Sequence, residues 1–204
     1  MTKKPVFALV GAVNHGKSSI AATLVEQGNI GVSADPGMTQ VCQKIEHHSG
    51  EFLLWDTPGF QDPRTMLAEL GSQLSEARKP LAVLQQFFEK YASTNTFEAE
   101  REVCKVLQDE PAILYVIDSS NPLRKIHEAE MELLMLTGLP RLAILNPTAF
   151  PEHEEEWRAK LGQRFGAVTA FNAHEASAHD RVALVRTLAT VVDKWRDALS
   201  KIAD

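Results

Sequence analysis

The chain has little of several features that would mark it as another kind of protein. It holds only two cysteines, Cys42 and Cys104, which are too few for a disulfide framework and are not spaced like metal ligands. No run of about 18 apolar residues occurs, so the sequence predicts no membrane span. The formal net charge is -6, and nonspecific nucleic-acid binding needs a basic face instead. We therefore expect a cytoplasmic protein without direct membrane association and without a nucleic-acid partner for this domain.

The composition is that of a globular protein, and its apolar segments predict the fold class. Of the 204 residues, 44% are hydrophobic and 24% are charged. Buried strands are expected at residues 6–10, 52–55, 112–117, 142–145 and 168–171, and an edge strand at 40–48. Helical patterns lie between them at 18–26, 125–137 and 152–165, with one long helix from 180 to the end. This alternation predicts an α/β domain over residues 1–204, with a mostly parallel six-stranded sheet covered on both faces.

The segment GAVNHGKS at residues 11–18 fits the phosphate-binding pattern GxxxxGK[ST], and it lies between a predicted strand and a predicted helix. The glycines let backbone N–H groups surround phosphate oxygens, and the helix adds its N-terminal dipole. Lys17 is expected to reach the terminal phosphates, and Ser18 to bind Mg²⁺. His15 is expected at the surface and not as a catalytic base. We expect the phosphates to be held by Asn14, His15, Gly16, Lys17, Ser18 and Ser19.

Two further segments are expected to sense the third phosphate. The strand at 52–55 ends on DTPG, where Asp56 would hold Mg²⁺ and Gly59 would donate its N–H to the γ-phosphate. In PGMT at residues 36–39, Thr39 could bind Mg²⁺ through its hydroxyl and the γ-phosphate through its backbone. Alternatively, this segment is only a turn before the edge strand. We expect catalysis to depend on Lys17, Thr39 and Gly59.

About fifty residues separate DTPG from the next buried strand, which is far more than one connecting helix needs. Their pattern predicts helices at about 63–75, 80–91 and 96–108. We interpret residues 61–110 as a helical insertion. It is either a packed addition to the core or, since it follows a phosphate-sensing loop, a nucleotide-sensitive surface for a partner.

The boxes GAVNHGKS, PGMT and DTPGF resemble, in this order, those of the bacterial GTPases of the Era, TrmE and EngA group, which share a Ras-like core. The phrases ILYVIDSSNP and FNAH are similar to those of a set of bacterial GTPases with a C-terminal domain of unknown function, so we expect this chain to be a GTPase portion. The resemblance implies a three-layer P-loop NTPase fold, GTP and GDP as ligands, Mg²⁺, slow hydrolysis and a regulatory switch. It also implies a protein partner at the switch loops and the insertion, and a possible nucleotide-dependent dimer.

The box that reads guanine in this group departs from its NKxD pattern. Here it is Asn146-Pro147-Thr148-Ala149, so the lysine and the aspartate are absent. The last box reads Asn172-Ala173-His174, where the backbone N–H of Ala173 could still meet guanine O6. Asn146 either contacts the base or only ties its loop to the phosphate loop. GTP therefore stays our prediction, with ATP or another triphosphate as the alternative.

Hydrolysis is expected to be slow because Phe60 stands where Ras-type enzymes place a water-orienting glutamine. Potassium-activated members of the resembled group have an asparagine at the fourth place of the phosphate loop, and Asn14 occupies that place. The resemblance thus implies a K⁺ ion beside the phosphates. The alternatives are that Asn14 only shapes the loop, and that the protein is a nucleotide-binding module with little hydrolysis.

Overall fold

The computed structural model describes residues 4–25, 41–47 and 50–203. Within them one sheet has the strand order β2-β3-β1-β4-β5-β6. The strands are β1 (Val6–Val10), β2 (Gln43–Glu46), β3 (Leu53–Asp56), β4 (Ala112–Ile117), β5 (Arg141–Leu145) and β6 (Ala167–Ala170). Edge strand β2 pairs antiparallel with β3, and the other described pairs are parallel. The predicted six-stranded, mostly parallel sheet is confirmed.

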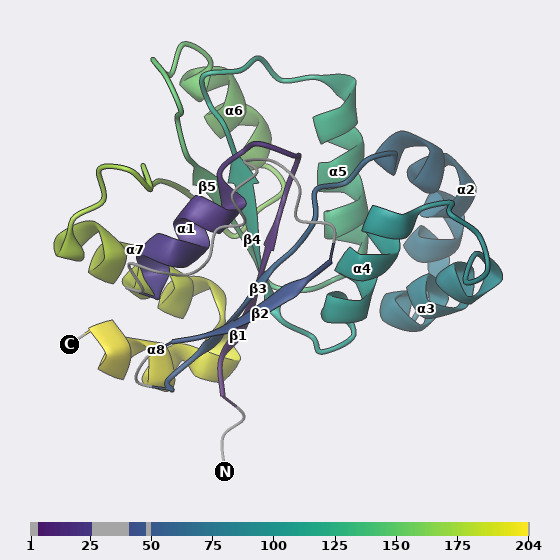
Figure 1. Cartoon of the computed structure of the whole chain (residues 1–204), viewed down its shortest axis with the longest axis horizontal. Coiled ribbons are helices and arrows are strands. Elements are labelled where there is room, and N and C mark those ends of the chain that lie inside the picture. The colour runs from purple at the N-terminus through teal and green to yellow at the C-terminus, as the bar shows by residue number, and fades with distance from the viewer. Residues whose placement is uncertain (1–3, 26–40, 48–49, 204) are drawn as a thin grey trace.

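Helices lie on both faces of the sheet, which gives three layers (Figure 1). One face is covered by α1 (Lys17–Leu24), α7 (Ala178–Val191) and α8 (Arg196–Ala203). On the other side lie α2 (Pro63–Glu76), α3 (Pro80–Lys90), α4 (Glu98–Leu107), α5 (Lys125–Leu136) and α6 (Glu154–Leu161). Strand β1 sends Phe7 and Leu9 into one apolar core and Ala8 and Val10 into the other. This burial on both faces explains why the central strands are continuous apolar runs.

The prediction of one long C-terminal helix was wrong. Helix α7 ends at Val191, and a short 3-10 turn (Asp193–Trp195) precedes α8. Val192 has φ -119° and ψ 84°, which is not helical. Trp195 is buried, and its ring meets that of Phe7 edge-on at 5.9 Å. Burying this indole against the sheet requires the chain to turn, which a straight helix would not allow.

The chain between β3 and β4 forms α2, α3 and α4, each within about two residues of the predicted helix. Helix α2 begins where the sequence provides a cap, because Asp62 Oδ1 accepts the N–H of Thr65 at 3.2 Å and Pro63 follows directly. Among the described helices, none has the length and apolarity that a membrane span requires.

Candidate functional site

The loop GAVNHGKS joins β1 to α1 as predicted, and its backbone depends on unusual conformations. Gly16 has φ +83°, and a Cβ there would lie 2.2 Å from the Nδ2 of Asn146. Asn14 has φ +66°, a left-handed conformation that asparagine tolerates better than most residues, and its side chain is exposed. Gly16 is thus needed for both its backbone angle and its missing side chain.

Lys17 is buried against this loop, and its ammonium donates to the carbonyls of Gly11 at 3.1 Å and Ala12 at 2.8 Å. Burial lowers the pKa of Lys17 to about 8, against the opposing attraction of Asp56 and Glu130. The structure therefore holds a cation inside the curve of the loop that is expected to bind phosphate.

Ser18, in the first turn of α1, lies next to Asp56, the last residue of β3. The Oγ of Ser18 donates to Oδ2 of Asp56 at 2.6 Å, and Asp56 is 3% exposed. Hydroxyl and carboxylate oxygens are ligands that Mg²⁺ prefers, so this pair fits the predicted ion. No group of three or more His, Cys, Asp or Glu among the described residues could hold a metal. Mg²⁺ at Ser18 and Asp56 would need further oxygen ligands, which phosphate oxygens, water and the predicted hydroxyl of Thr39 can supply.

Gly59 packs directly on the phosphate loop. A Cβ at this position would lie 2.5 Å from the N of Val13 and 2.8 Å from the C of Ala12, both backbone atoms. The next residue, Phe60, is buried in the apolar core. The DTPG segment is thus fixed beside the loop, as its predicted role requires. Thr39 lies outside the described residues.

The base-reading box is occupied by internal hydrogen bonds. Asn146 is 1% exposed; its Nδ2 donates to the carbonyl of His15 at 3.1 Å, and its Oδ1 accepts the N–H of Ala173 at 3.0 Å. The link between Asn146 and the phosphate loop is therefore present. The N–H of Ala173 that was expected at guanine O6 is donated to Asn146 here. The exposed His174 donates its N–H to Oδ1 of Asn172 at 3.0 Å.

The expectation that His15 lies at the surface was wrong. Its ring is buried, with Nδ1 3.3 Å from the carbonyl oxygen of Val116, because the loop folds over the end of β4. The ring centroid lies 5.4 Å from that of His127, which in turn lies 5.0 Å from that of Trp157. Burial lowers the pKa of both histidines, that of His127 to about 4. Ser19 contributes a backbone contact within α1, where its carbonyl accepts the Thr23 hydroxyl at 2.9 Å.

Asp118 belongs to none of the nucleotide-binding motifs in the sequence, yet it organises the loops at the end of β4. Its carboxylate accepts the hydroxyl of Thr148 at 2.6 Å, the hydroxyl of Ser120 at 2.5 Å and the amide of Asn121 at 2.7 Å. Burial opposes the ionisation of Asp118, but the hydrogen bonds from Ser120 and Thr148 bring its pKa below the usual value. Thr148, within the atypical base-reading box, thus serves to anchor the loop. The small polar residues Ser119, Ser120 and Asn121 after this buried strand are the sequence feature that could have indicated such a role for Asp118.

A second carboxylate missed by sequence analysis, Glu130 of α5, is fully buried. Oε2 of Glu130 accepts the hydroxyl of Tyr115 at 2.6 Å, and burial raises the pKa of Glu130 to about 7. Because folding raises the pKa of Glu130 from 4.5 to about 7, the protonated carboxyl favours the folded state more than the carboxylate does. This contribution to stability is complete below pH 4.5 and is lost as the pH rises through 7. Glu130→Gln keeps an acceptor for Tyr115 without the charge.

We therefore expect the free energy of unfolding of Glu130→Gln, relative to that of the wild type, to increase by on the order of 2 kcal/mol from pH 5 to pH 7.5. Urea denaturation of both proteins at the two pH values measures this. Buried His15 and His127 act in the opposite sense below pH 6.5, but they are common to both proteins and cancel in the comparison. A difference between the proteins that is the same at both pH values would contradict the account.

Solved structures share this fold at low sequence identity. Era in complex with MgGDPNP and 16S ribosomal RNA nucleotides is 18% identical with a TM-score of 0.59, over 92% of this chain and 56% of that one. The FeoB G-domain from Methanococcus jannaschii is 14% identical with a TM-score of 0.55, over 97% and 99% of the two chains. NFeoB from S. thermophilus bound to GDP·AlF4⁻ and K⁺ is 18% identical with a TM-score of 0.54, over 92% and 62%. The likeness confirms the predicted Ras-like P-loop fold, and the chain spans little more than half the length of Era.

Sequence comparison supplies the family. No curated protein matches the chain significantly. The family described as 50S ribosome-binding GTPase matches residues 6–147, which include the phosphate loop, the DTPG segment and the start of the base-reading box. Since this match covers more than half of the chain, the protein belongs to the 50S ribosome-binding GTPase family, and it is a P-loop GTPase of the Era-like type.

Proposed function

We propose that this protein binds GTP and GDP with Mg²⁺, hydrolyses GTP slowly and acts as a regulatory switch. The observation that carries the proposal is the hydrogen bond between Ser18 and Asp56 beside the buried Lys17. It places a hydroxyl, a carboxylate and an ammonium at the mouth of a loop whose N–H groups can bind phosphate. Nucleotide phosphates with a bound Mg²⁺ complement this arrangement.

Each residue has a distinct proposed role. Lys17 contacts the terminal phosphates, Ser18 and Asp56 hold Mg²⁺, and Thr39 adds a second hydroxyl to the ion. Gly59 donates its N–H to the γ-phosphate. When bound, Mg²⁺ neutralises charge on the phosphates. Turnover is slow because the buried ring of Phe60 cannot orient a water molecule.

Titration with fluorescent GDP, GTP and ATP in Mg²⁺ tests the ligand. We expect the affinity for GTP to exceed that for ATP by at least about fivefold, since the neutral N–H of Ala173 can donate to guanine O6 but not to the amino group of adenine, and one neutral hydrogen bond contributes about 1 kcal/mol. Equal affinities would reject guanine specificity.

A second candidate is a nucleotide-binding module with relaxed base specificity and little hydrolysis. Ala149 replaces the carboxylate that accepts hydrogen bonds from guanine, and the N–H of Ala173 is donated to Asn146. Losing that acceptor removes about 1.5–3 kcal/mol of guanine preference per bond. Under this candidate the affinities for GTP and ATP agree within about threefold, and single-turnover assays show little phosphate release.

Asn14 supports potassium activation, because its exposed amide stands at the rim of the phosphate loop. We predict that wild-type GTP hydrolysis is at least about fivefold faster in KCl than in NaCl, because a site between the Asn14 amide and the phosphates would fit K⁺ better than the smaller Na⁺, and the bound cation would neutralise charge at the phosphates. Asn14→Gly should remove this difference, since glycine keeps the left-handed backbone and lacks the amide. Stopped-flow phosphate release in the two salts measures both rates. Equal wild-type rates would reject K⁺ as an activator.

We propose further that the switch loops and the helices of residues 61–110, as an insertion in a single domain, bind a protein partner in the cytoplasm. The acidic net charge supports a protein over RNA as the ligand of this domain. A nucleotide-dependent dimer is the simplest partner. Analytical ultracentrifugation with GDP·AlF4⁻ and K⁺ should then show a concentration-dependent dimer, which GDP alone does not give.

A further inference from the structure

The segment that follows Gly59 is held by a buried carboxylate from a distant helix. Oε1 of Glu100, in α4, accepts the backbone N–H groups of Gln61 and Asp62, both at 2.7 Å. Glu100 is 1% exposed. Carboxylates are rarely buried this fully unless their charge is compensated, and hydrogen bonds to charged groups are among the stronger ones. Glu100 therefore fixes the chain just after the expected γ-phosphate contact.

The same segment is held from its other side by the phosphate loop. Gly59 lies against the backbone of Val13 and Ala12, as the Cβ distances above show, and Phe60 is buried in the apolar core. Only Phe60 separates Gly59 from Gln61. The four residues from Gly59 to Asp62 thus lie between the phosphate loop and α4, and Asp62 then caps α2.

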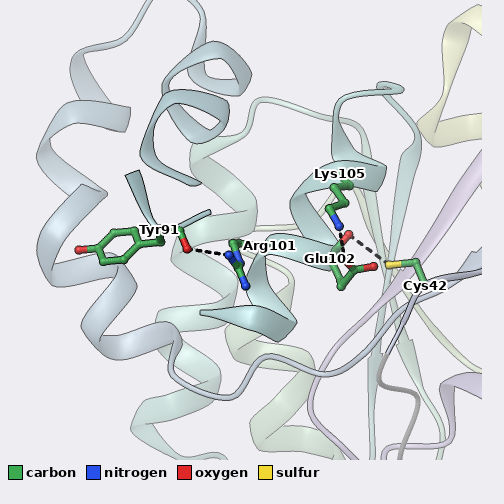
Figure 2. A network of polar contacts seen from close by, with 5 residues as sticks. All are labelled: Cys42, Tyr91, Arg101, Glu102 and Lys105. Carbon is green, nitrogen blue, oxygen red and sulfur yellow. Dashed lines mark hydrogen bonds and ion pairs between the residues drawn. The ribbon is translucent and has the colours of Figure 1, made fainter. Parts of the chain in front are cut away.

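Residues 100–102 of α4 contact three separate parts of the chain. Besides the Glu100 contact, Arg101 donates from Nη1 to the carbonyl of Tyr91 at the end of α3, at 2.6 Å. The carbonyl of Glu102 accepts the thiol of Cys42, which lies just before β2, at 3.1 Å. Figure 2 shows Arg101 and Glu102 reaching in opposite directions to these two partners. A shift of the backbone at Gln61 would therefore act on α4 and on the segments that α4 contacts.

We propose that Glu100 is a positioning residue: it holds the backbone after Gly59 so that the Gly59 N–H is aligned for a γ-phosphate, which makes triphosphate binding depend on α4. This inference rests on the proposed function and adds a residue that none of the sequence motifs contains. Diphosphate contacts the P-loop but not Gly59, so Glu100 affects the two nucleotides differently.

Affinities of GDP and of a non-hydrolysable GTP analogue, measured by fluorescence for Glu100→Ala and Glu100→Gln, test this difference. Glu100→Ala should weaken the analogue about tenfold, the loss expected for charged hydrogen bonds, and change GDP affinity by less than about twofold. Glu100→Gln should restore part of the analogue affinity, because its amide oxygen still accepts. Glu98→Gln, an exposed change in the first turn of α4, is the matched control and should leave both affinities unchanged. Equal losses for both nucleotides, or no loss, would overturn the proposal.

Amide hydrogen exchange provides a readout without nucleotide. The amides of Gln61 and Asp62 should exchange at least about tenfold faster in Glu100→Ala than in the wild type. If the alanine variant does not fold, Glu100→Met, which has a similar size but no oxygen acceptor, takes its place. Unchanged exchange would overturn the positioning role. If the wild type binds neither nucleotide while the two amides still depend on Glu100, the proposed function fails and the backbone contact stands.

Discussion

Lys17→Ala is expected to weaken the binding of both GDP and GTP by at least about a hundredfold. A charged hydrogen bond contributes about 1.5–3 kcal/mol, and the ammonium can make two of them to terminal phosphate oxygens. The structure already holds this ammonium within the phosphate loop, against the carbonyls of Gly11 and Ala12. Fluorescence titration with both nucleotides measures the loss.

The pKa of Lys17 indicates that weaker binding by Lys17→Ala would not come from a loss of folding. Burial lowers the pKa of Lys17 from 10.5 to about 8, so burying the charged ammonium opposes folding at neutral pH. Removal of this charge in Lys17→Ala should therefore not lower the free energy of unfolding. Lys90→Ala, an exposed change at the end of α3, is the matched control and should leave affinity unchanged. Tight binding by a folded Lys17→Ala protein would contradict the assignment of the phosphate loop.

Gly59→Ala is expected to reduce GTP hydrolysis by at least about a hundredfold and to lower the melting temperature. A Cβ at Gly59 would lie 2.5, 2.8 and 2.9 Å from three backbone atoms of the phosphate loop, and backbone cannot move aside as a flexible side chain can. The loop and the DTPG segment must therefore separate. Single-turnover hydrolysis and thermal unfolding measure the two effects.

Gly71→Ala is the matched control for this change. Gly71 lies within α2, and its added Cβ would lie 3.1 Å from the flexible end of Leu67. Alanine is preferred over glycine inside a helix by about 1 kcal/mol, so this variant should be at least as stable as the wild type. Normal hydrolysis by Gly59→Ala would show that this segment does not need its close approach to the phosphate loop.

The sequence predicted well those parts of the fold that depend on local pattern. The strands buried on both faces are continuous apolar runs, and α2 begins at a capping Asp62 followed by Pro63. The break at Val192 was not foreseen, because it results from burying Trp195 against Phe7, a contact between opposite ends of the chain.

The same distinction applies to the site. The positions of Lys17, Ser18 and Asp56 followed from two motifs that lie at the carboxyl ends of the adjacent parallel strands β1 and β3. By contrast, Glu100 and Glu130 lie in helices whose sequences carry no motif, and their importance comes from burial and from long-range partners. The burial of His15 was missed because the spacing of the phosphate loop does not reveal that the loop folds over β4.

The most direct test of the central claim is single-turnover hydrolysis of GTP by the wild type and by Asp56→Ala, with and without Mg²⁺. We expect slow release of phosphate from GTP by the wild type in Mg²⁺, little release from ATP, and a loss of release when either Mg²⁺ or the Asp56 carboxylate is removed. Phosphate release that is the same in Asp56→Ala, or that does not need Mg²⁺, would contradict the claim.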